Sequence, residues 1–565
     1  MLKIIMKRFY RPEIDGLRAI AVLGVIFYHA EIIFNGNQII SGGFLGVDIF
    51  FVISGYLITS IIIDEYKETK NFSYTNFYVR RAKRLMPALL VVIFFTTFLA
   101  YIYLLPAQYE EYYKSIISSI FFTSNFFFHY SGQEYGENIL SSAPLLHTWS
   151  LGIEEQFYIL YPIVLIFILK FFKKDIKSLF VIGILSSISF TVIVGVDHQS
   201  FNFYMLPSRI WELLCGGIIV IWKRGNVNLF FSKYEKFLST LGLLLILFSF
   251  VYFNDVNKHP SYYTILPVLG CSILLMNNKS SNYINSILSI SMLRKIGLIS
   301  YSLYLWHHPV LSFGKITGIT GLDNENLFVK ILLILLSIIV ASISFNFVEK
   351  IFRKKMNIPI KKIIVGFSIG CLFIVVFPYT LKNLQEKKFP SIVSELHKKT
   401  WFETKQNFKS CFQRKEYFCS FNRNGKEPVF LVGDSILASI QEELKDSLIR
   451  KDYNFIPMTN AGCDFLDIDL KKQKNIFCNN EIYKQRKKVI LNKKNGIIIL
   501  HINYKNSISF KDEKTQKKLQ KDLMNFLNLG YKVIFIYPIP QMNVNISKKL
   551  SKKFFLNKKK FIESL

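Results

Sequence analysis

Acidic side chains are scarce in this sequence. Its 565 residues include 39 Asp and Glu against 70 Lys and Arg, a formal net charge of +31. Only 19% of the residues are charged and 51% are hydrophobic, with a mean hydropathy of +0.30. A basic soluble protein would suggest nucleic-acid binding, but here the Lys and Arg residues fall largely in short loops beside apolar runs. The composition therefore predicts a polytopic membrane protein with no nucleic-acid partner.

A cleavage site and a metal-ligand pattern are also missing. The basic N-terminus leads into an apolar run that carries Arg18, His29 and Glu31 and has no clear small-x-small cleavage site. We interpret this run as a first transmembrane helix rather than a cleaved signal peptide. No group of His, Cys, Asp and Glu has the spacing of a metal site, and we expect no metal.

Cysteine is sparse, and its seven residues fall into two groups. The first group lies in apolar segments, where small buried thiols are expected: Cys215, Cys271 and Cys371. The second group lies in the soluble last third: Cys411, Cys419, Cys463 and Cys478. Four cysteines in one soluble region predict two disulfides and an oxidising compartment. Three pairings are possible, and proximity favours Cys411–Cys419 with Cys463–Cys478.

Apolar runs of membrane-spanning length recur along the first two thirds of the chain. Eleven are candidate transmembrane helices: roughly 17–35, 44–63, 86–105, 150–172, 178–196, 207–222, 237–253, 261–276, 296–313, 328–348 and 363–379. The shorter run near 115–128 is predicted to pack at the outer surface or to re-enter the membrane.

Basic residues in the loops predict the orientation of these spans. With the N-terminus inside, every inner loop carries several Lys or Arg residues, whereas the outer loops hold only Lys114, Lys258 and Lys315. An odd number of spans puts the C-terminal part outside, the side that the cysteines indicate. We therefore expect a bacterial cytoplasmic (inner) membrane protein with a cytoplasmic N-terminus and an extracytoplasmic, periplasmic C-terminal domain.

The sequence divides into four predicted parts. Residues 1–355 form a transmembrane domain, and 356–380 add one more helix. Residues 381–428 are a polar, Lys-rich linker on the outer side. Residues 429–565 alternate β-rich and helical runs, which is typical of a small α/β domain. The expected fold class is an α-helical polytopic membrane domain of about eleven transmembrane helices followed by an α/β extracytoplasmic domain.

Ionisable residues inside apolar segments are costly and therefore indicate function. Arg18 and His29 share the first span, eleven residues apart, or about 16 Å along a helix. Arg18 lies near the cytosolic edge, so a long anionic donor can place its phosphates there and its reactive end near His29. The alternative is that His29 pairs structurally with a neighbouring helix, and the spacing alone leaves both open.

Further polar groups lie near the ends of other spans. They are Asp48, the stretch of Arg80, Arg81 and Arg84, His147, Glu154, the pair Arg209 and Glu212, and His307 with His308. The arginine stretch is either a set of positive-inside anchors or a phosphate clamp. The pair is three residues apart and fits one ion pair on a helix. Histidines and carboxylates are predicted to converge in the outer half while arginines gather inside, with a histidine as general base.

Ordered blocks within residues 10–355 closely resemble the membrane acyltransferase-3 family. The blocks are Arg11–Val22 with His29 (an Arg-x10-His motif), Gly42–Ile58, Arg80–Arg84, His147–Tyr158 and Ser300–His307. The resemblance implies an acyl-coenzyme A donor, usually acetyl-CoA, and a glycan acceptor outside. It implies that His29 is the base or a transient acyl carrier.

The resemblance also implies positions for the donor and for supporting groups. The coenzyme is expected near Arg18, Arg80, Arg81 and Arg84. Residues expected to support the substrates are Asp15, Asp48, His147, Glu154, Arg209, Glu212 and His307.

The C-terminal part resembles the SGNH hydrolase-like domain that many members of this family carry. A β-like run leads into Gly433-Asp434-Ser435, and a serine at such a strand-to-helix turn is presented as a nucleophile. Gly462 and Asn503 are candidates for the oxyanion-binding blocks. The final Asp-x-x-His block, which would supply a base, is missing, since no Asp lies three residues before the last histidine, His501. The domain is truncated, or divergent and inactive, or another group such as His501 serves.

Three functions compete. The first is transfer of an acyl group from cytosolic acyl-CoA to hydroxyls of lipopolysaccharide O-antigen, capsule, exopolysaccharide or peptidoglycan. The second is a transporter with an intramembrane proton relay. Against it, the sequence shows no paired Gly/Pro-broken segments in matching halves, which are typical of such proteins. The third is a surface glycan esterase that the membrane part merely anchors. Eleven spans are far more than anchoring requires. We therefore favour the O-acyltransferase.

Overall fold

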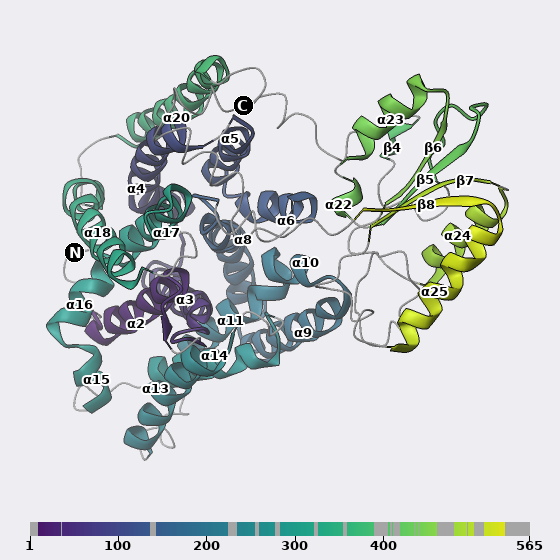
Figure 1. Cartoon of the computed structure of the whole chain (residues 1–565). Coiled ribbons are helices and arrows are strands. Elements are labelled where there is room, and N and C mark those ends of the chain that lie inside the picture. The colour runs from purple at the N-terminus through teal and green to yellow at the C-terminus, as the bar shows by residue number, and fades with distance from the viewer. Residues whose placement is uncertain are drawn as a thin grey trace. The chain divides into compact units, whose positions relative to one another are not determined.

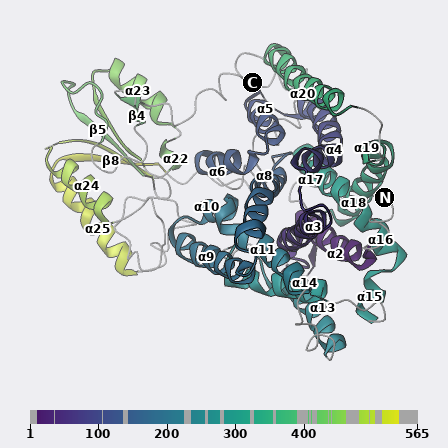
Figure 2. The same cartoon turned by 180° about the vertical axis from the view of Figure 1, so that it is seen from behind.

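The chain forms two units that are described separately. The computed structural model describes residues 10–34, 37–104, 106–135, 143–223, 234–254, 259–276, 283–320, 326–353, 359–388, 405–406, 409–410, 418–433, 435–438, 440–459, 480–493, 495–501 and 513–536. A helical unit reaches to Lys388, and a sheet-containing unit lies within Phe389–Asn543. Figure 1 and Figure 2 show both units from opposite sides.

The helical unit is built mainly from the helices that correspond to the predicted spans. They are α2 Pro12–His29, α3 Gly46–Thr69, α4 Tyr74–Tyr103, α8 Thr148–Phe171, α9 Ile176–Asp197, α11 Leu206–Lys223, α13 Glu235–Tyr252, α14 Ile265–Met276, α17 Ser300–Thr317, α18 Leu327–Ser344 and α20 Ile360–Lys388. Shorter elements join them: α5 Pro106–Ile120, α6 Ser124–Tyr135, α10 Gln199–Tyr204, α15 Tyr283–Leu288, α16 Ser291–Leu298, a π-helical turn Phe345–Glu349 and α19 Lys350–Arg353.

Within the described residues, eight helical segments are long and apolar enough to span a membrane. They contain α3, α4, α8, α9, α11, α13, α18 and α20. The other three predicted spans also form helices, namely α2, α14 and α17. However, α2 carries three charged residues and α14 has only 12 residues. The helical membrane fold is confirmed, and the count of eleven spans stays a prediction.

The run near 115–128 forms parts of two helices. Helix α5 ends at Ile120 and α6 begins at Ser124. Phe122, between them, has a φ of 55°. This value lies in the left-handed region, so the right-handed helix cannot continue through Phe122. Neither helix qualifies as a membrane span.

Two glycines allow helices α3 and α11 to pack backbone to backbone. A Cβ atom on Gly55 would lie 1.8 Å from the Leu213 carbonyl oxygen, and one on Gly216 would lie 1.9 Å from that of Val52. No larger residue fits either position, and close helix approach through small residues is typical of membrane proteins. Helix α3 is thereby held against α11 along the side that carries Asp48 and Arg209.

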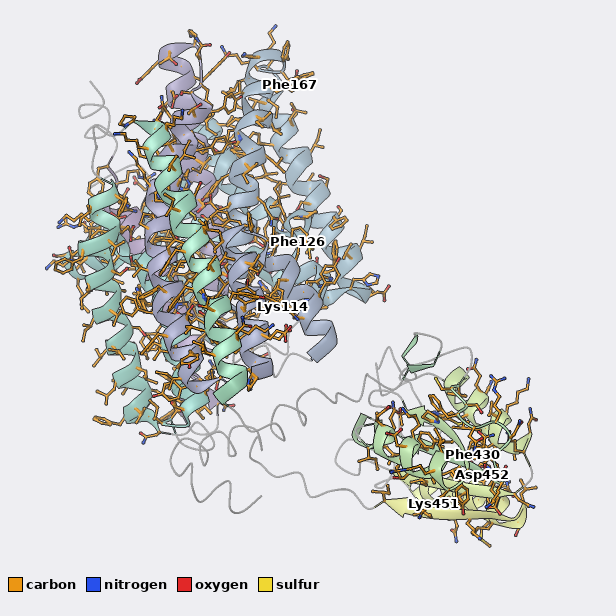
Figure 3. All side chains as sticks on the ribbon, turned by 90° about the horizontal axis from the view of Figure 1, so that it is seen from above. Lys114, Phe126, Phe167, Phe430, Lys451 and Asp452 are labelled. Atoms are coloured by element: carbon orange, nitrogen blue, oxygen red, sulfur yellow. The ribbon has the colours of Figure 1, made fainter. Side chains whose placement is uncertain are left out.

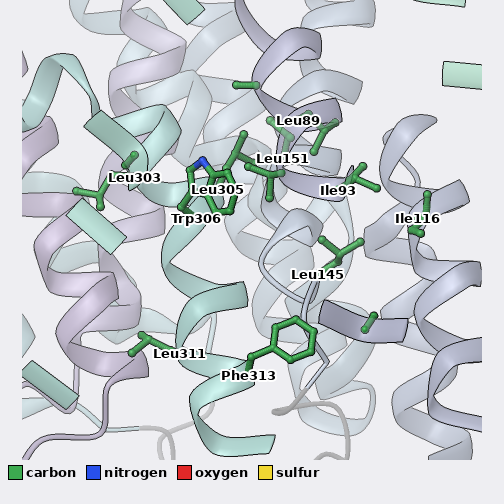
Figure 4. Close-up of a cluster of buried hydrophobic side chains, with 14 of the residues drawn as sticks. Leu89, Ile93, Ile116, Leu145, Leu151, Leu303, Leu305, Trp306, Leu311 and Phe313 are labelled. Atoms are coloured by element: carbon green, nitrogen blue, oxygen red, sulfur yellow. The ribbon is translucent and has the colours of Figure 1, made fainter. Parts of the chain in front are cut away.

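The apolar core around α17 holds the helices that carry the site. Figure 4 shows Leu303, Leu305 and Trp306 of α17 beside Leu89 and other side chains of a buried cluster. Large apolar side chains are also exposed on the outside of the helical unit. Phe167 of α8, labelled in Figure 3, is 54% exposed. Apolar groups on both the inside and the outside of a bundle are expected when lipid surrounds it.

The second unit is a four-stranded parallel sheet with helices. Its strands are β5 Pro428–Gly433, β6 Asn454–Thr459, β7 Gly496–His501 and β8 Tyr531–Ile536, in the order β6-β5-β7-β8. Its helices are α22 Ser435–Ala438, α23 Gln441–Arg450, α24 Asn480–Leu491 and α25 Glu513–Asn528. Figure 3 labels the core residue Phe430 on β5. The predicted α/β domain is confirmed.

The boundary between the units differs from the predicted one. Helix α20 continues to Lys388, past the predicted start of the linker at 381. Phe421, predicted to lie in the linker, pairs its backbone with Phe455 of β6. Part of the polar stretch therefore belongs to the sheet unit.

Candidate functional site

Four imidazoles meet in the helical unit, and we call them the histidine cluster: His29, His147, His307 and His308. His29 ends α2, His147 precedes α8, and the other two lie in the middle of α17. The ring centroid of His29 lies 4.9 Å from that of His308 and 5.5 Å from that of His307. His147 stacks on His308 at 5.2 Å with an interplanar angle of 19°. The predicted convergence of these histidines is observed.

The histidine cluster is buried and offers open nitrogen atoms. His147, His307 and His308 are at most 3% exposed. The Nδ1 atom of His307 donates to the Tyr304 carbonyl at 2.6 Å, so its Nε2, which has no partner in the described structure, is an acceptor. Both nitrogens of His147 and Nδ1 of His308 likewise lack partners there. Buried polar atoms without partners are uncommon in folded proteins and indicate a place for a ligand or a proton.

Pro309 shapes this part of α17. Because proline has no N–H, it leaves the carbonyl of Leu305, four residues earlier, without its helical donor. That carbonyl faces the His147 ring. Tyr304, on the same helix, donates to the His147 carbonyl at 2.9 Å and pairs its hydroxyl with Ser150 at 2.6 Å. The start of α8 is thereby fixed against α17.

Four arginines form a second group, which we call the arginine cluster: Arg18, Arg81, Arg84 and Arg353. They come from α2, α4 and α19 and interact electrostatically with one another. Three have a carboxylate partner: Arg18 with Asp15 at 3.7 Å, Arg81 with Glu155 at 3.0 Å, and Arg353 with Glu349 at 2.9 Å. Arg84 has no carboxylate within 4.0 Å in the described part of the chain. The cluster can accept an anionic ligand at that position.

A tyrosine links Arg81 to a further carboxylate. The Arg81 guanidinium lies 3.9 Å from the ring centroid of Tyr158, a cation–π distance. The Tyr158 hydroxyl and the Ser54 hydroxyl both donate to Glu154. Glu154 was expected among the histidines in the outer half, but its neighbours are those of the arginine cluster, because it lies two turns further along α8 than His147.

Arg80 lies apart from the arginine cluster. Its side chain is 45% exposed and pairs with Glu65 at 3.2 Å. Adjacent residues on a helix point about 100° apart, so Arg81 turns inward while Arg80 turns outward. Of the predicted arginine stretch, the structure brings only Arg81 and Arg84 to Arg18.

A third charged group is completely buried. Arg209 lies 3.1 Å from Asp48 and 3.2 Å from Glu212, and all three side chains have no exposed area. His259 pairs with Asp48 at 3.4 Å and contacts Arg209 at 2.8 Å. The ion pair expected between Arg209 and Glu212 is present. The network ties α3 and α11 to the segment that contains His259.

In the sheet unit, Ser435 follows the central strand β5 and begins α22. All strands are parallel, so their carboxyl ends share one edge, the usual place for a site in such sheets. His501 ends β7 at the same edge. The candidates Gly462 and Asn503 lie outside the described residues.

Of the four outer cysteines, the structure describes Cys419. It is buried and disulfide-bonded. Cys411, Cys463 and Cys478 lie outside the described residues, so the pairing stays a prediction. In the described part of the chain, no group of three His, Cys, Asp or Glu residues is arranged to hold a metal ion.

Several site neighbours were not singled out from the sequence. Glu349 and Arg353 are four residues apart at the end of a span, and this spacing is a usable signal for an ion pair. Tyr304 and His259 carried no signal, because their partners are distant in the sequence.

Comparison with known proteins adds two family matches. Residues 11–347 match the acyltransferase domain family, and residues 404–563 match the SGNH domain that is fused to such domains. The proteins named O-acetyltransferase OatA from Staphylococcus aureus strains NCTC 8325, COL and MRSA252 are each 36% identical over 356 residues. The matched segment covers 61% of this chain and 58% of those relatives, less than two thirds of their length. No solved structure matches the chain.

Proposed function

The chain belongs to the acyltransferase-3 family, and on this premise we propose that it transfers an acetyl group from acetyl-CoA to a hydroxyl of a cell-envelope glycan. The donor binds from the cytosolic side and the acceptor from the outer side of the cytoplasmic membrane. Lipopolysaccharide, capsule, exopolysaccharide and peptidoglycan are the acceptor classes to test.

One observation carries the proposal: α2 belongs to both clusters. Arg18 lies in its second turn and His29 at its end, which places them about 16 Å apart along the axis. An anionic group held at one end and a reactive carbonyl held at the other fit a long donor that carries phosphates.

The arginine cluster supplies the donor site. Arg81 and Arg353 are engaged by carboxylates, whereas Arg84 has no carboxylate partner among the described residues. Guanidinium groups bind phosphate oxygens through paired, charge-assisted hydrogen bonds. Arg84 is therefore the group that would hold the coenzyme's phosphates. Arg18, whose 3.7 Å contact with Asp15 is the longest of the three ion pairs in the cluster, would assist it.

His29 acts as the base of the transfer. It takes the proton of the acceptor hydroxyl as that oxygen attacks the thioester carbonyl. When the C–S bond breaks, the thiolate takes a proton back, and the products are an ester and a free thiol. Burial of the surrounding imidazoles keeps water from competing with the acceptor.

The test is made in the host. The gene is deleted, and ester-linked acetate on purified envelope glycans is measured by mass spectrometry after complementation with wild type, His29→Ala or the control His198→Ala. His198 is exposed and outside both clusters. We expect the deletion to remove the ester, wild type and the control to restore it, and His29→Ala to fail.

Other outcomes favour the competing functions. Ester that increases on deletion indicates an esterase. Ester that is unchanged on deletion contradicts the transferase and favours a transporter. Full complementation by His29→Ala contradicts the assigned base.

A further inference from the structure

His308 lies at the centre of the histidine cluster. The sequence placed it among the polar groups of the spans, but neither the sequence nor the family resemblance gave it a role. Its ring centroid is 4.9 Å from His29 and 5.2 Å from His147. His307 is further from both, at 5.5 and 5.7 Å. In the described structure, no ring contact joins His29 directly to His147. His308 is therefore the closest connection between them.

Hydrogen bonding fixes which nitrogen of His308 is open. The ring faces the backbone of Pro144, and since proline offers only a carbonyl there, the ring nitrogen that faces it is a donor. Nδ1 has no partner in the described structure, so Nε2 is the donor. Nδ1 is left as a buried acceptor that can take a proton.

The charged surroundings of His308 are few. His29 faces it from α2, His147 from the start of α8, and His307 and Lys315 lie on its own helix. Lys315 is paired with Glu31 at 2.6 Å. No carboxylate lies within 4.0 Å of the four rings among the described residues, unlike the usual arrangement in which an acid orients the catalytic histidine.

We propose that His308 is a positioning residue that acts through His29 and shares its proton. In this proposal, which rests on the proposed function, the acceptor hydroxyl gives its proton to His29 as the ester bond forms. His29 passes that proton to Nδ1 of His308 while the tetrahedral intermediate exists. The proton returns through His29 to the thiolate when the C–S bond breaks, so no proton is gained or lost.

Two substitutions separate proton sharing from ring packing. His308→Phe keeps a ring that can stack on His147 but cannot take a proton, and His308→Gln removes the ring. The full-length protein is purified in detergent. Thiol release from acetyl-CoA is then measured with a tetrasaccharide of N-acetylglucosamine as the acceptor probe. His198→Gln, at an exposed site, is the matched control.

We expect both variants to lower kcat by about 10- to 100-fold while KM for acetyl-CoA stays within about twofold of wild type, because His308 is not in the arginine cluster. Wild-type kcat in His308→Phe would overturn the proposal, since packing would then suffice. A rise in KM with unchanged kcat, or absence of both variants from the membrane, would also overturn it. If wild type itself transfers nothing to any glycan in the host, the proposed function fails instead.

Discussion

The histidine and arginine clusters solve the problem of burial in opposite ways. The arginines are permanently charged, and three of the four face a carboxylate. The imidazoles can be neutral and need no counter-charge, and several of their nitrogens have no partner in the part of the chain that the structure describes. A buried charge must be paired to be tolerated, whereas a neutral ring can stay open to exchange protons. One end of α2 is therefore suited to binding and the other to proton transfer.

The comparison predicts different costs for removing one member of each cluster. Arg81→Gln leaves the mostly buried Glu155 without its partner and is expected to destabilise the protein by about 3–5 kcal/mol. His147→Gln breaks no ion pair among the described residues and loses at most the contact of its ring with the Leu305 carbonyl, so it is expected to cost about 1 kcal/mol. Thermal melting of the full-length protein in detergent measures both. Equal losses of melting temperature would contradict the distinction.

A smaller effect is expected where α16 packs against the start of α2. A Cβ on Gly297 would lie 1.8 Å from the Asp15 carbonyl oxygen, so Gly297→Ala is expected to cost about 1–3 kcal/mol through overpacking. Since Asp15 pairs with Arg18, KM for acetyl-CoA should also rise. Gly366→Ala is the control, because nothing lies within 4 Å of that position. Indistinguishable melting curves for the two variants would argue against this packing.

A further substitution tests by itself the arginine that has no carboxylate partner among the described residues. Arg84→Gln breaks no ion pair with a described carboxylate, so the melting temperature should change little. KM for acetyl-CoA should rise about tenfold, the loss of one charge-assisted bond, with kcat preserved. Arg80→Gln, whose side chain points away to Glu65, is the control. A fall in kcat with an unchanged KM would contradict a role of Arg84 in donor binding and would indicate a role in proton transfer.

The smallest effect is expected in the sheet unit. Ser435→Ala should leave glycan acetate unchanged, because residues 429–565 contain no Asp-x-x-His block that could supply a base. The measurement is the same ester determination in the complemented host. A loss of half or more of the ester would instead show that this serine takes part in the transfer.

The motif of α2 and its division of labour were visible in the sequence, because Arg18 and His29 lie on one helix of known rise. The grouping of Arg18 with Arg81 and Arg84 followed from basic residues near one side of the membrane. The position of Glu154 beside the arginine cluster could not be predicted from the sequence. Its place depends on its distance along α8 from His147. It also depends on the hydroxyls of Ser54 on α3 and Tyr158 on α8.

Contacts between distant segments were also out of reach. The network of Asp48, Arg209, Glu212 and His259 joins residues separated by up to 211 positions. The spacing of Arg209 and Glu212 was all that the sequence could indicate of it. Likewise, the stacking of His308 on His147 depends on how α17 packs against α8. Such juxtapositions depend on packing angles, for which a single sequence carries no periodic signal.

The rigidity of α2 has a consequence for which molecules can react. Its 18 residues form one unbroken helix, so the distance between the positions of Arg18 and His29 is fixed. In the proposed reaction, a donor too short to reach from Arg18 to His29 could not place its thioester carbonyl beside His29. One residue inserted between them would increase this distance by about 1.5 Å and rotate His29 about the helix axis by about 100°. In the proposed reaction, the backbone of a single helix would thereby select the length of the donor.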